Sequence, residues 1–269
     1  MKYAVCNKIF KDKKWEEVCR FVKSAGFDGI EIAPMTFAES VKDILPSQRA
    51  EIRRVAADNG LELPALHSLM FSPKGLVINS PDPAVRQRAV DYLNALFEFA
   101  ADLECRLLIY GSAPSRNVQG GLTYKQARSN MKESLLKCLD SAKKAGLMLC
   151  LEPLAADTTS LFTTVEAAYG FVCEVNHPSF GLMADCKAMS SEKRPIQDTI
   201  RLFGSEIRHV HGNDALGVAP GFGAVDFAPI LQALKEIGYQ DYFSLEPFSC
   251  RPDAETVTSV SLKYLKSLL

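Results

Sequence analysis

Short apolar runs alternate with longer segments whose apolar residues recur every three or four positions along the whole chain. The longer segments have the spacing of amphipathic helices, as Trp15, Val18, Val22 and Ala25 illustrate. The short runs are rich in aliphatic and aromatic residues, which is typical of buried strands. They predict eight strands, at residues 3–7, 29–33, 63–68, 107–111, 147–152, 180–185, 208–211 and 242–246.

Residues that commonly begin or end helices stand at the edges of the helical segments. Gly26 follows the first helical pattern, where a left-handed C-cap is expected. Side chains that can accept hydrogen bonds from the first backbone N–H groups of a helix precede several other segments. The predicted N-terminal signals are Asp82 before Pro83, Thr123 with Gln126, Thr163 with Glu166, Asp226 and Asp253.

The regular spacing of the predicted strands points to a closed barrel. Between Val5 and Leu245, seven strand-to-strand intervals average about 34 residues, the size of a βα unit. No Pro/Gly/Ser-rich linker interrupts the alternation, so we predict an α/β fold in which residues 1–269 form a single (β/α)8 TIM-barrel domain. The alternative is a doubly wound open sheet. That fold usually has a glycine-rich phosphate turn, and neither GxGxxG nor GxxxxGK[ST] occurs here.

Composition and charge exclude several classes of protein. The chain is 47% hydrophobic and 23% charged, which is typical of a globular protein and excludes a disordered or fibrous one. Lys and Arg total 31 against 32 Asp and Glu, so no bulk charge attracts nucleic acid or an anionic membrane. The basic run at residues 8–14 is interpreted as a solvated loop rather than a nucleic-acid patch, because Asp12 interrupts it and Trp15 begins a helical pattern.

The cysteines and the apolar segments bear on the compartment. Eight cysteines occur without a CxxC motif, mostly inside apolar segments, and are expected to be reduced, buried thiols of a cytoplasmic protein. No stretch reaches the roughly 18 apolar residues of a membrane span, and the N-terminus lacks the pattern of a signal peptide. We therefore expect neither a membrane anchor nor secretion.

Each of the last four predicted strands ends in a residue that can bind a metal ion, and the set is Glu152, Asp185, His211 and Glu246. The C-terminal ends of barrel strands form the open mouth where functional groups stand. An unpaired carboxylate at the end of an apolar strand is costly, and one shared divalent cation would compensate the charges of all three carboxylates in this set. At any single position the alternative is structural, with Glu-Pro as a strand terminator or Asp185 as a loop cap. The common register on four strands favours the metal.

The donor set indicates the kind of metal and of reaction. Three carboxylates and one imidazole suit Mn²⁺, Mg²⁺ or Co²⁺, with catalytic Zn²⁺ as an alternative. A cation of this kind polarises the carbonyl of a sugar and stabilises the enediolate left when an α proton departs. Glu152 and Glu246 lie on different sides of the predicted mouth, so we expect them to carry that proton as well as to bind the metal.

Five segments carry a resemblance to a known family. They are GFDGIEI at 26–32, LEPL at 151–154, HVHGND at 209–214, PGFGAVDF at 220–227 and SLEPF at 244–248. Together they resemble the xylose isomerase-like TIM-barrel superfamily, and within it the sugar phosphate isomerase/epimerase branch, which includes ketose 3-epimerases and hydroxypyruvate isomerases. The resemblance covers nearly the whole chain. It implies a metal held by Glu152, Asp185, His211 and Glu246, with Glu152 and Glu246 as the acid/base pair.

The chain departs from the ketose-epimerase pattern after the sixth strand. That pattern has His three residues beyond the metal-binding Asp, where this chain has Ala188. We therefore expect a hydroxy-carbonyl substrate other than a free hexulose, with an anionic compound as a candidate. His67, Arg116 and Lys187 are the candidate substrate-binding residues. The alternatives are a structural histidine at the barrel end for His67 and surface charges for Arg116 and Lys187.

Two other functions compete with a metal-dependent sugar isomerase or epimerase. One is a non-catalytic barrel that binds a sugar or metabolite through the same residues. The other is an apurinic endonuclease with several zinc ions, which needs more histidines than the four present. The expected partner is a small sugar-like substrate, with no nucleic acid and no membrane. The sequence leaves the sugar, its phosphorylation and the formation of a homo-oligomer open.

Overall fold

The computed structural model describes all 269 residues and contains the eight predicted strands in one parallel sheet. The sheet order is β2-β1-β8-β7-β6-β5-β4-β3, and two isolated parallel bridges, Gly29–Glu62 and Ile32–Leu66, link β2 to the segment that contains β3. The strands therefore close into the predicted barrel. They are β1 (Lys2–Cys6), β2 (Gly29–Glu31), β3 (Ala65–Leu66), β4 (Leu107–Tyr110), β5 (Met148–Leu151), β6 (Phe180–Asp185), β7 (Ile207–Gly212) and β8 (Tyr242–Leu245).

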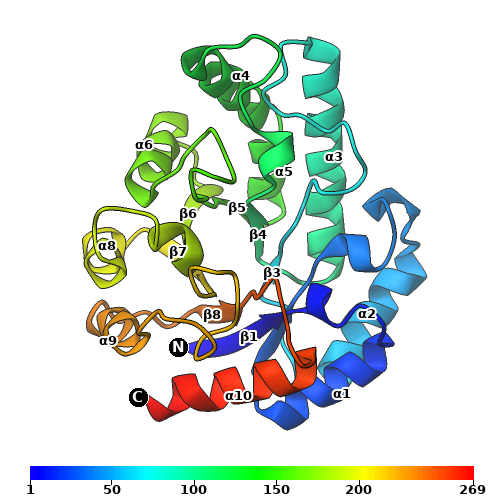
Figure 1. Cartoon of the computed structure of the whole chain (residues 1–269). Helices are drawn as coiled ribbons and strands as arrows, with labels where there is room; N and C mark the ends of the chain where they lie inside the picture. The colour runs from blue at the N-terminus through cyan, green and yellow to red at the C-terminus, as the bar shows by residue number, and fades with distance from the viewer.

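Helices surround the strands, so the chain has the ring-within-a-ring arrangement of a (β/α)8 barrel (Figure 1). The α-helices are α1 (Trp15–Ala25), α2 (Pro46–Asp58), α3 (Pro83–Asp102), α4 (Tyr124–Leu136), α5 (Leu139–Lys144), α6 (Val165–Val175), α7 (Cys186–Met189), α8 (Ile196–Phe203), α9 (Ala228–Glu236) and α10 (Ala254–Ser267). Short 3-10 helices occur in the loops, as η1 (Asn7–Ile9), η2 (Pro34–Thr36), η3 (Val41–Asp43) and η4 (Ala113–Ser115).

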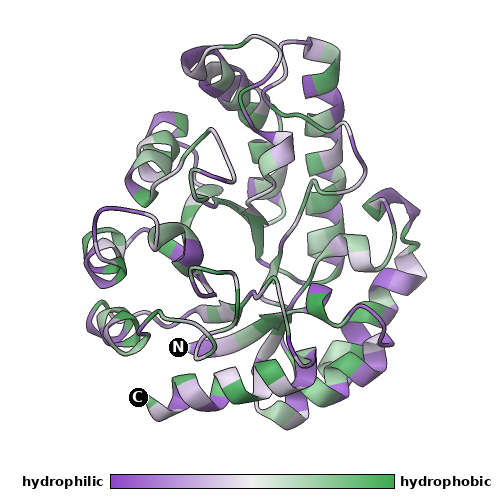
Figure 2. Cartoon of the chain, in the orientation of Figure 1, coloured by the Kyte–Doolittle hydropathy of each residue, from purple (hydrophilic) through white to green (hydrophobic).

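The apolar stripes of the helices pack against the barrel, as the periodicity predicted. In α1, Val18, Cys19 and Val22 are buried, while the intervening charged residues face outwards. The helices in Figure 2 accordingly carry both hydrophilic and hydrophobic residues, whereas the strands are mainly hydrophobic. The main core joins 67 buried residues of the strands and the helices. This core fixes the strand ends from which the candidate site is built.

Most of the predicted helix boundaries are confirmed. Gly26 ends α1 in the left-handed region at φ 95°, and the side chains of Asp82, Thr123 and Asp253 accept hydrogen bonds from backbone N–H groups at the start of α3, α4 and α10. The prediction at Thr163 is wrong by one residue, because the next residue, Thr164, accepts the hydrogen bond that begins α6.

Two other boundaries differ from the prediction. Asp226 accepts a hydrogen bond from Ala228 N, but it lies one residue before the N-cap of α9, which is Phe227. The third strand is much shorter than the predicted 63–68 and comprises only Ala65–Leu66. Pro64 has no N–H to donate to a neighbouring strand, which explains why regular pairing begins after it.

All eight cysteines are free, and six are buried. The expectation of buried thiols holds for these six but not for Cys173, which is exposed, or for Cys250, which is half-buried. None of the helices combines the length and the apolar character that crossing a membrane requires.

Candidate active site

The structure brings the four predicted metal ligands together at the C-terminal ends of four neighbouring strands. Asp185 and His211 end or nearly end β6 and β7 and pair in register, and Glu152 and Glu246 follow the last residues of β5 and β8. One ligand atom from each residue lies within 4.8 Å of the others, and all four side chains are buried. Strand length and register therefore suffice to place four metal-binding groups around one point.

His211 lies at the centre of this group. Its Nδ1 is 2.9 Å from Glu152 Oε1, 3.1 Å from Glu246 Oε2 and 3.9 Å from Asp185 Oδ2. Burial opposes the charged imidazolium, but the surrounding carboxylates, led by Glu31, raise the pKa of His211 well above its usual value. Nδ1 is thus the ring nitrogen that faces the predicted ligand set.

A fourth carboxylate, which the sequence reasoning missed, faces the other ring nitrogen. Glu31 ends β2 and is fully buried, with Oε1 3.0 Å from His211 Nε2. Ser244 and Cys6 also donate to it. Burial alone would raise the pKa of Glu31, but the neighbouring His211 and His209 hold it well below its usual value. A metal-binding histidine needs an acceptor for its second N–H, and Glu31 supplies that acceptor.

Asp185 shows why this group of side chains suits a cation. Burial, together with the charges of Glu152 and Glu246, raises the pKa of Asp185 to about 7. Its two oxygens are oriented by hydrogen bonds, with Oδ1 accepting from Ala188 N at 2.7 Å and Oδ2 accepting from Asn213 Nδ2 at 2.8 Å. Three carboxylates and one imidazole nitrogen, crowded and buried, form a donor set that fits a divalent cation.

Lys8 is a residue of the candidate site that the sequence interpretation placed wrongly. It was expected in a solvated basic loop, but η1 folds it back over the mouth, where its Nζ lies 2.5 Å from Glu246 Oε1. Burial would raise the pKa of Glu246, but Lys8 and then His211 lower it well below the usual value. Lys8, which follows β1, therefore stabilises the charged carboxylate of Glu246, which follows the neighbouring strand β8.

A cavity of about 100 Å³, here called the mouth cavity, opens beside three of the predicted ligands, Glu152, Asp185 and Glu246. His67 and Lys187, two of the candidate substrate-binding residues, line it. His67 is buried, with Nδ1 3.4 Å from Glu246 Oε1. Two cations lie near the ring of Phe248, with Lys8 Nζ 5.0 Å and Lys187 Nζ 5.9 Å from its centroid. The remaining lining residues are Ser68, Phe71, Gly111, Ala113, Glu152, Leu154, Ala155, Thr158, Asp185, Ala188 and Glu246.

Arg116 does not line the mouth cavity, and its burial contradicts the alternative of a surface charge. Its side chain is fully buried beneath the loop after β4, and Nη2 donates to the backbone oxygen of Glu152 at 2.6 Å. Its Nε and Nη1 have no hydrogen-bond partner. The guanidinium lies 5.9 Å from the centroid of the Tyr110 ring and supports the end of β5 through the backbone of Glu152.

Gly111 allows Glu152 to reach its position. A Cβ atom at residue 111 would lie only 1.5 Å from Glu152 Oε2 and 2.6 Å from its Cδ. No side chain can therefore occupy this point while Glu152 keeps its place. The end of β4 is shaped by the carboxylate that follows β5.

Comparisons with known proteins agree with this barrel and with the resemblance seen in the motifs. Residues 19–268 match the family model described as xylose isomerase-like TIM barrel. A D-psicose 3-epimerase from Ruminiclostridium cellulolyticum is 27% identical over 246 residues, covering 88% of this chain and 80% of that protein. An L-ribulose-5-phosphate 3-epimerase from Salmonella paratyphi A is 24% identical over 242 residues, covering 87% and 82%. A crystal structure of D-psicose 3-epimerase in the presence of D-fructose has a TM-score of 0.88 at 21% identity, covering 100% and 99%.

Replacing Glu31 by Gln should weaken metal binding, because the amide accepts a weaker hydrogen bond from His211 than the carboxylate does. We expect the affinity for Mn²⁺ to fall about 10- to 100-fold, the range typical for the partner of a metal-binding histidine. Isothermal titration calorimetry measures this change. Glu16→Gln, an exposed position on α1, is the matched control and should leave the affinity unaltered. Equal affinities in the two variants would contradict the role given to Glu31.

Metal binding should also depend on pH. The pKa of Asp185 is raised to about 7 and that of His211 is raised further, so both groups hold protons that a cation must displace as pH falls. We expect the Mn²⁺ affinity to decrease by at least about tenfold for each pH unit below 7. Calorimetry from about pH 6 to about pH 8, in buffers of different ionisation enthalpy, counts the protons released. An affinity that stays constant over this range would refute the prediction.

Proposed function

The chain belongs to the xylose isomerase-like TIM-barrel family, and on that premise we propose that it is a divalent-metal-dependent isomerase or epimerase of a sugar or small hydroxy-carbonyl compound. The observation that carries the proposal is the convergence of Glu152, Asp185, His211 and Glu246, whose ligand atoms lie within 4.8 Å of one another. The relatives named above are sugar epimerases, which supports a sugar-like substrate. The carboxylate-rich donor set supports Mn²⁺, Mg²⁺ or Co²⁺ as the cation.

In the proposed reaction the chain moves a proton at the carbon next to the substrate carbonyl. When bound, the divalent cation supplies polarisation of the carbonyl and compensates the negative charge of the enediolate. Glu152 and Glu246 approach the mouth from β5 and β8, so one carboxylate can take the proton and the other can return it. Return from the opposite face inverts the carbon, whereas return to the neighbouring carbon moves the carbonyl.

The surroundings of the two glutamates support these roles. Lys8 and His67 both contact Glu246 Oε1, which keeps this carboxylate oriented towards the cavity. Glu152 is held through its backbone by Arg116 and has room for its side chain because residue 111 is glycine. Both proton carriers are therefore positioned by groups that need not themselves react.

A turnover screen tests the proposal against a barrel that binds sugars without changing them. Ketoses, aldoses and their phosphates are incubated with the Mn²⁺-loaded protein, and the products are separated by chromatography. We expect conversion of at least one compound, with loss of conversion on chelation by EDTA and recovery when Mn²⁺ is restored. Saturable binding of a sugar without any conversion would favour the non-catalytic alternative.

Glu152→Gln and Glu246→Gln should each abolish turnover, because each change removes a proton carrier and alters the predicted ligand set. The double variant should be little worse than the more impaired single variant, since residues that act as a unit do not have additive effects. Steady-state rates and Mn²⁺ titrations of the same preparations separate loss of chemistry from loss of metal. A single variant that binds Mn²⁺ and keeps most of its activity would refute the two-carboxylate mechanism.

The cations of the mouth cavity suggest that the substrate is anionic. Lys8 and Lys187 are the only lysines or arginines that line it, and Ala188 leaves the position after Lys187 without a polar group. Lys187 Nζ takes part in no ion pair, so it is available for a phosphate or carboxylate group. We propose that a phosphorylated or otherwise anionic hydroxy-carbonyl compound is preferred over a free hexulose.

Lys187→Met should raise KM for a phosphorylated ketose by about tenfold or more, the loss expected for one charge-assisted hydrogen bond. The same variant should have nearly the wild-type KM for the corresponding free ketose. Lys144→Met, at an exposed position at the end of α5, removes the same charge away from the mouth and serves as the control. Efficient conversion of free hexuloses, with no preference for their phosphates in the wild type, would refute the anionic substrate.

A further inference from the structure

A second cavity, of about 640 Å³, opens at the N-terminal ends of the strands, the end of the barrel opposite the mouth. Its wall includes residues near the starts of β1, β4, β5, β7 and β8, residues 61–64 before β3, and residues of α2 and of the segment between α3 and β4. It shares no lining residue with the mouth cavity. A ligand in this lower cavity would therefore be separate from the substrate of the proposed reaction.

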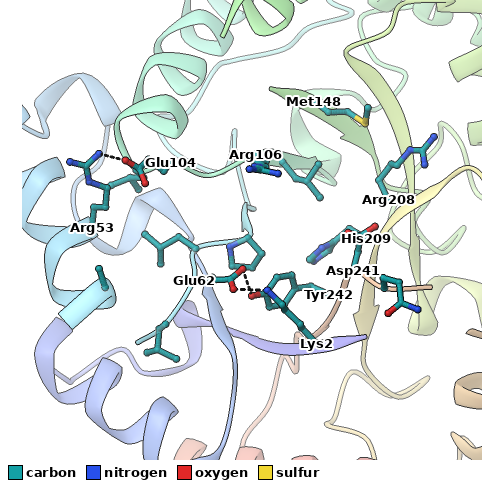
Figure 3. Close-up of a pocket in the computed structure, with 17 residues that line it drawn as sticks. Lys2, Arg53, Glu62, Glu104, Arg106, Met148, Arg208, His209, Asp241 and Tyr242 are labelled. Atoms are coloured by element: carbon teal, nitrogen blue, oxygen red, sulfur yellow. Dashed lines mark hydrogen bonds and ion pairs between the residues drawn. The ribbon is translucent and has the colours of Figure 1, made fainter. Parts of the chain in front are cut away.

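Charged side chains from several strand ends surround the lower cavity (Figure 3). Two ion pairs account for four of them, with Lys2 Nζ 2.5 Å from Glu62 Oε1 and Arg53 Nη1 2.7 Å from Glu104 Oε1. Tyr242 also donates to Glu62, at 2.9 Å. Each of these two carboxylates is therefore already paired with a cation, and the charge of Arg106 also contributes to lowering the pKa of Glu62.

Two arginines of the same cavity have no such partner. The guanidinium groups of Arg106 and Arg208 make no ion pair and no hydrogen bond, and both side chains are exposed. The remaining carboxylate, Asp241, makes no ion pair either. With four cationic and three anionic side chains, the lining has a net charge of +1. The lower cavity thus differs from the mouth, where carboxylates predominate.

A buried polar side chain forms the inner wall of the cavity. His209 is fully buried, and neither of its ring nitrogens has a hydrogen-bond partner. Its Nε2 lies 3.4 Å from Glu31 Oε2, which leaves Nδ1 without a charged neighbour. Figure 3 shows the ring extending from β7 towards the space between Arg106 and Tyr242. Buried polar atoms are nearly always paired with protein, water or a ligand.

We propose that the lower cavity binds a small organic anion through a phosphate or carboxylate group. Arg106 and Arg208 supply the planar donors that such oxyanions accept, and Nδ1 of His209 supplies a polar contact at the inner end. Leu63, together with the neighbouring proline and Met148, gives an apolar wall for the carbon part of the ligand. The site includes none of the four predicted metal ligands and does not rest on the proposed reaction, although His209 lies beside Glu31, the partner of His211.

Calorimetric titration of the metal-loaded protein with inorganic phosphate, and separately with succinate, tests this proposal and distinguishes the two kinds of oxyanion. The Arg106→Ala/Arg208→Ala double variant should bind the preferred anion at least about tenfold more weakly than the wild type. Arg20→Ala/Arg88→Ala removes the same charge from two exposed arginines without ion pairs and should bind as the wild type does. Circular dichroism checks that both variants are folded.

The mouth needs its own control, because phosphate can also bind near the metal and the lysines there. A Lys8→Met/Lys187→Met variant should keep the binding event assigned to the lower cavity. The proposal would be overturned if this variant lost binding while the Arg106→Ala/Arg208→Ala protein bound the anion as the wild type does. Equal weakening in the two arginine double variants, or no binding of either anion to the wild type, would overturn it as well.

Discussion

The compensation of negative charge in a buried space is the constraint on which the mouth of this barrel depends. Glu31, Glu152, Asp185 and Glu246 all face His211, in an environment where an isolated carboxylate is strongly disfavoured. The carboxylates differ in how this environment shifts their pKa values: the pKa of Asp185 is raised, whereas the pKa values of Glu31 and Glu246 are lowered. Lysine, hydroxyl and amide groups recruited from other strands complete the compensation. A fold that places so many acids together demands a cation there, whether from the chain or from solution.

The sequence predicts this arrangement where it depends on strand register. The last residues of β5 to β8 are recognisable in the pattern, and the barrel rule then brings Glu152 and its three counterparts together. The same rule applied to β1 and β2 would have found Lys8 and Glu31, which stand at the corresponding ends. The rule does not predict the burial of Arg116, because that burial depends on contacts with Tyr110 and with the backbone of Glu152, and no local pattern encodes them.

A net charge of −1 conceals two barrel ends of different character. Carboxylates predominate around the mouth, whereas arginines and lysines outnumber acids around the opposite opening. Summed over the chain these groups nearly cancel, so composition excludes attraction to a large polyanion but says nothing about small ligands. Strand direction allows this separation, since all eight strands are parallel and each end of the barrel gathers one kind of strand terminus.

The missing side chain at Gly111 limits how the mouth can be engineered. Any larger residue there would take the space of the Glu152 carboxylate and displace it from the site. A library meant to widen or reshape the pocket gains nothing from this position, although it lies on the wall. Diversity is better sought at Phe71 and Thr158, which border the same space. The position of Gly111 is thus fixed by the Glu152 carboxylate, and new specificity has to come from lining residues that do not contact the carboxylates.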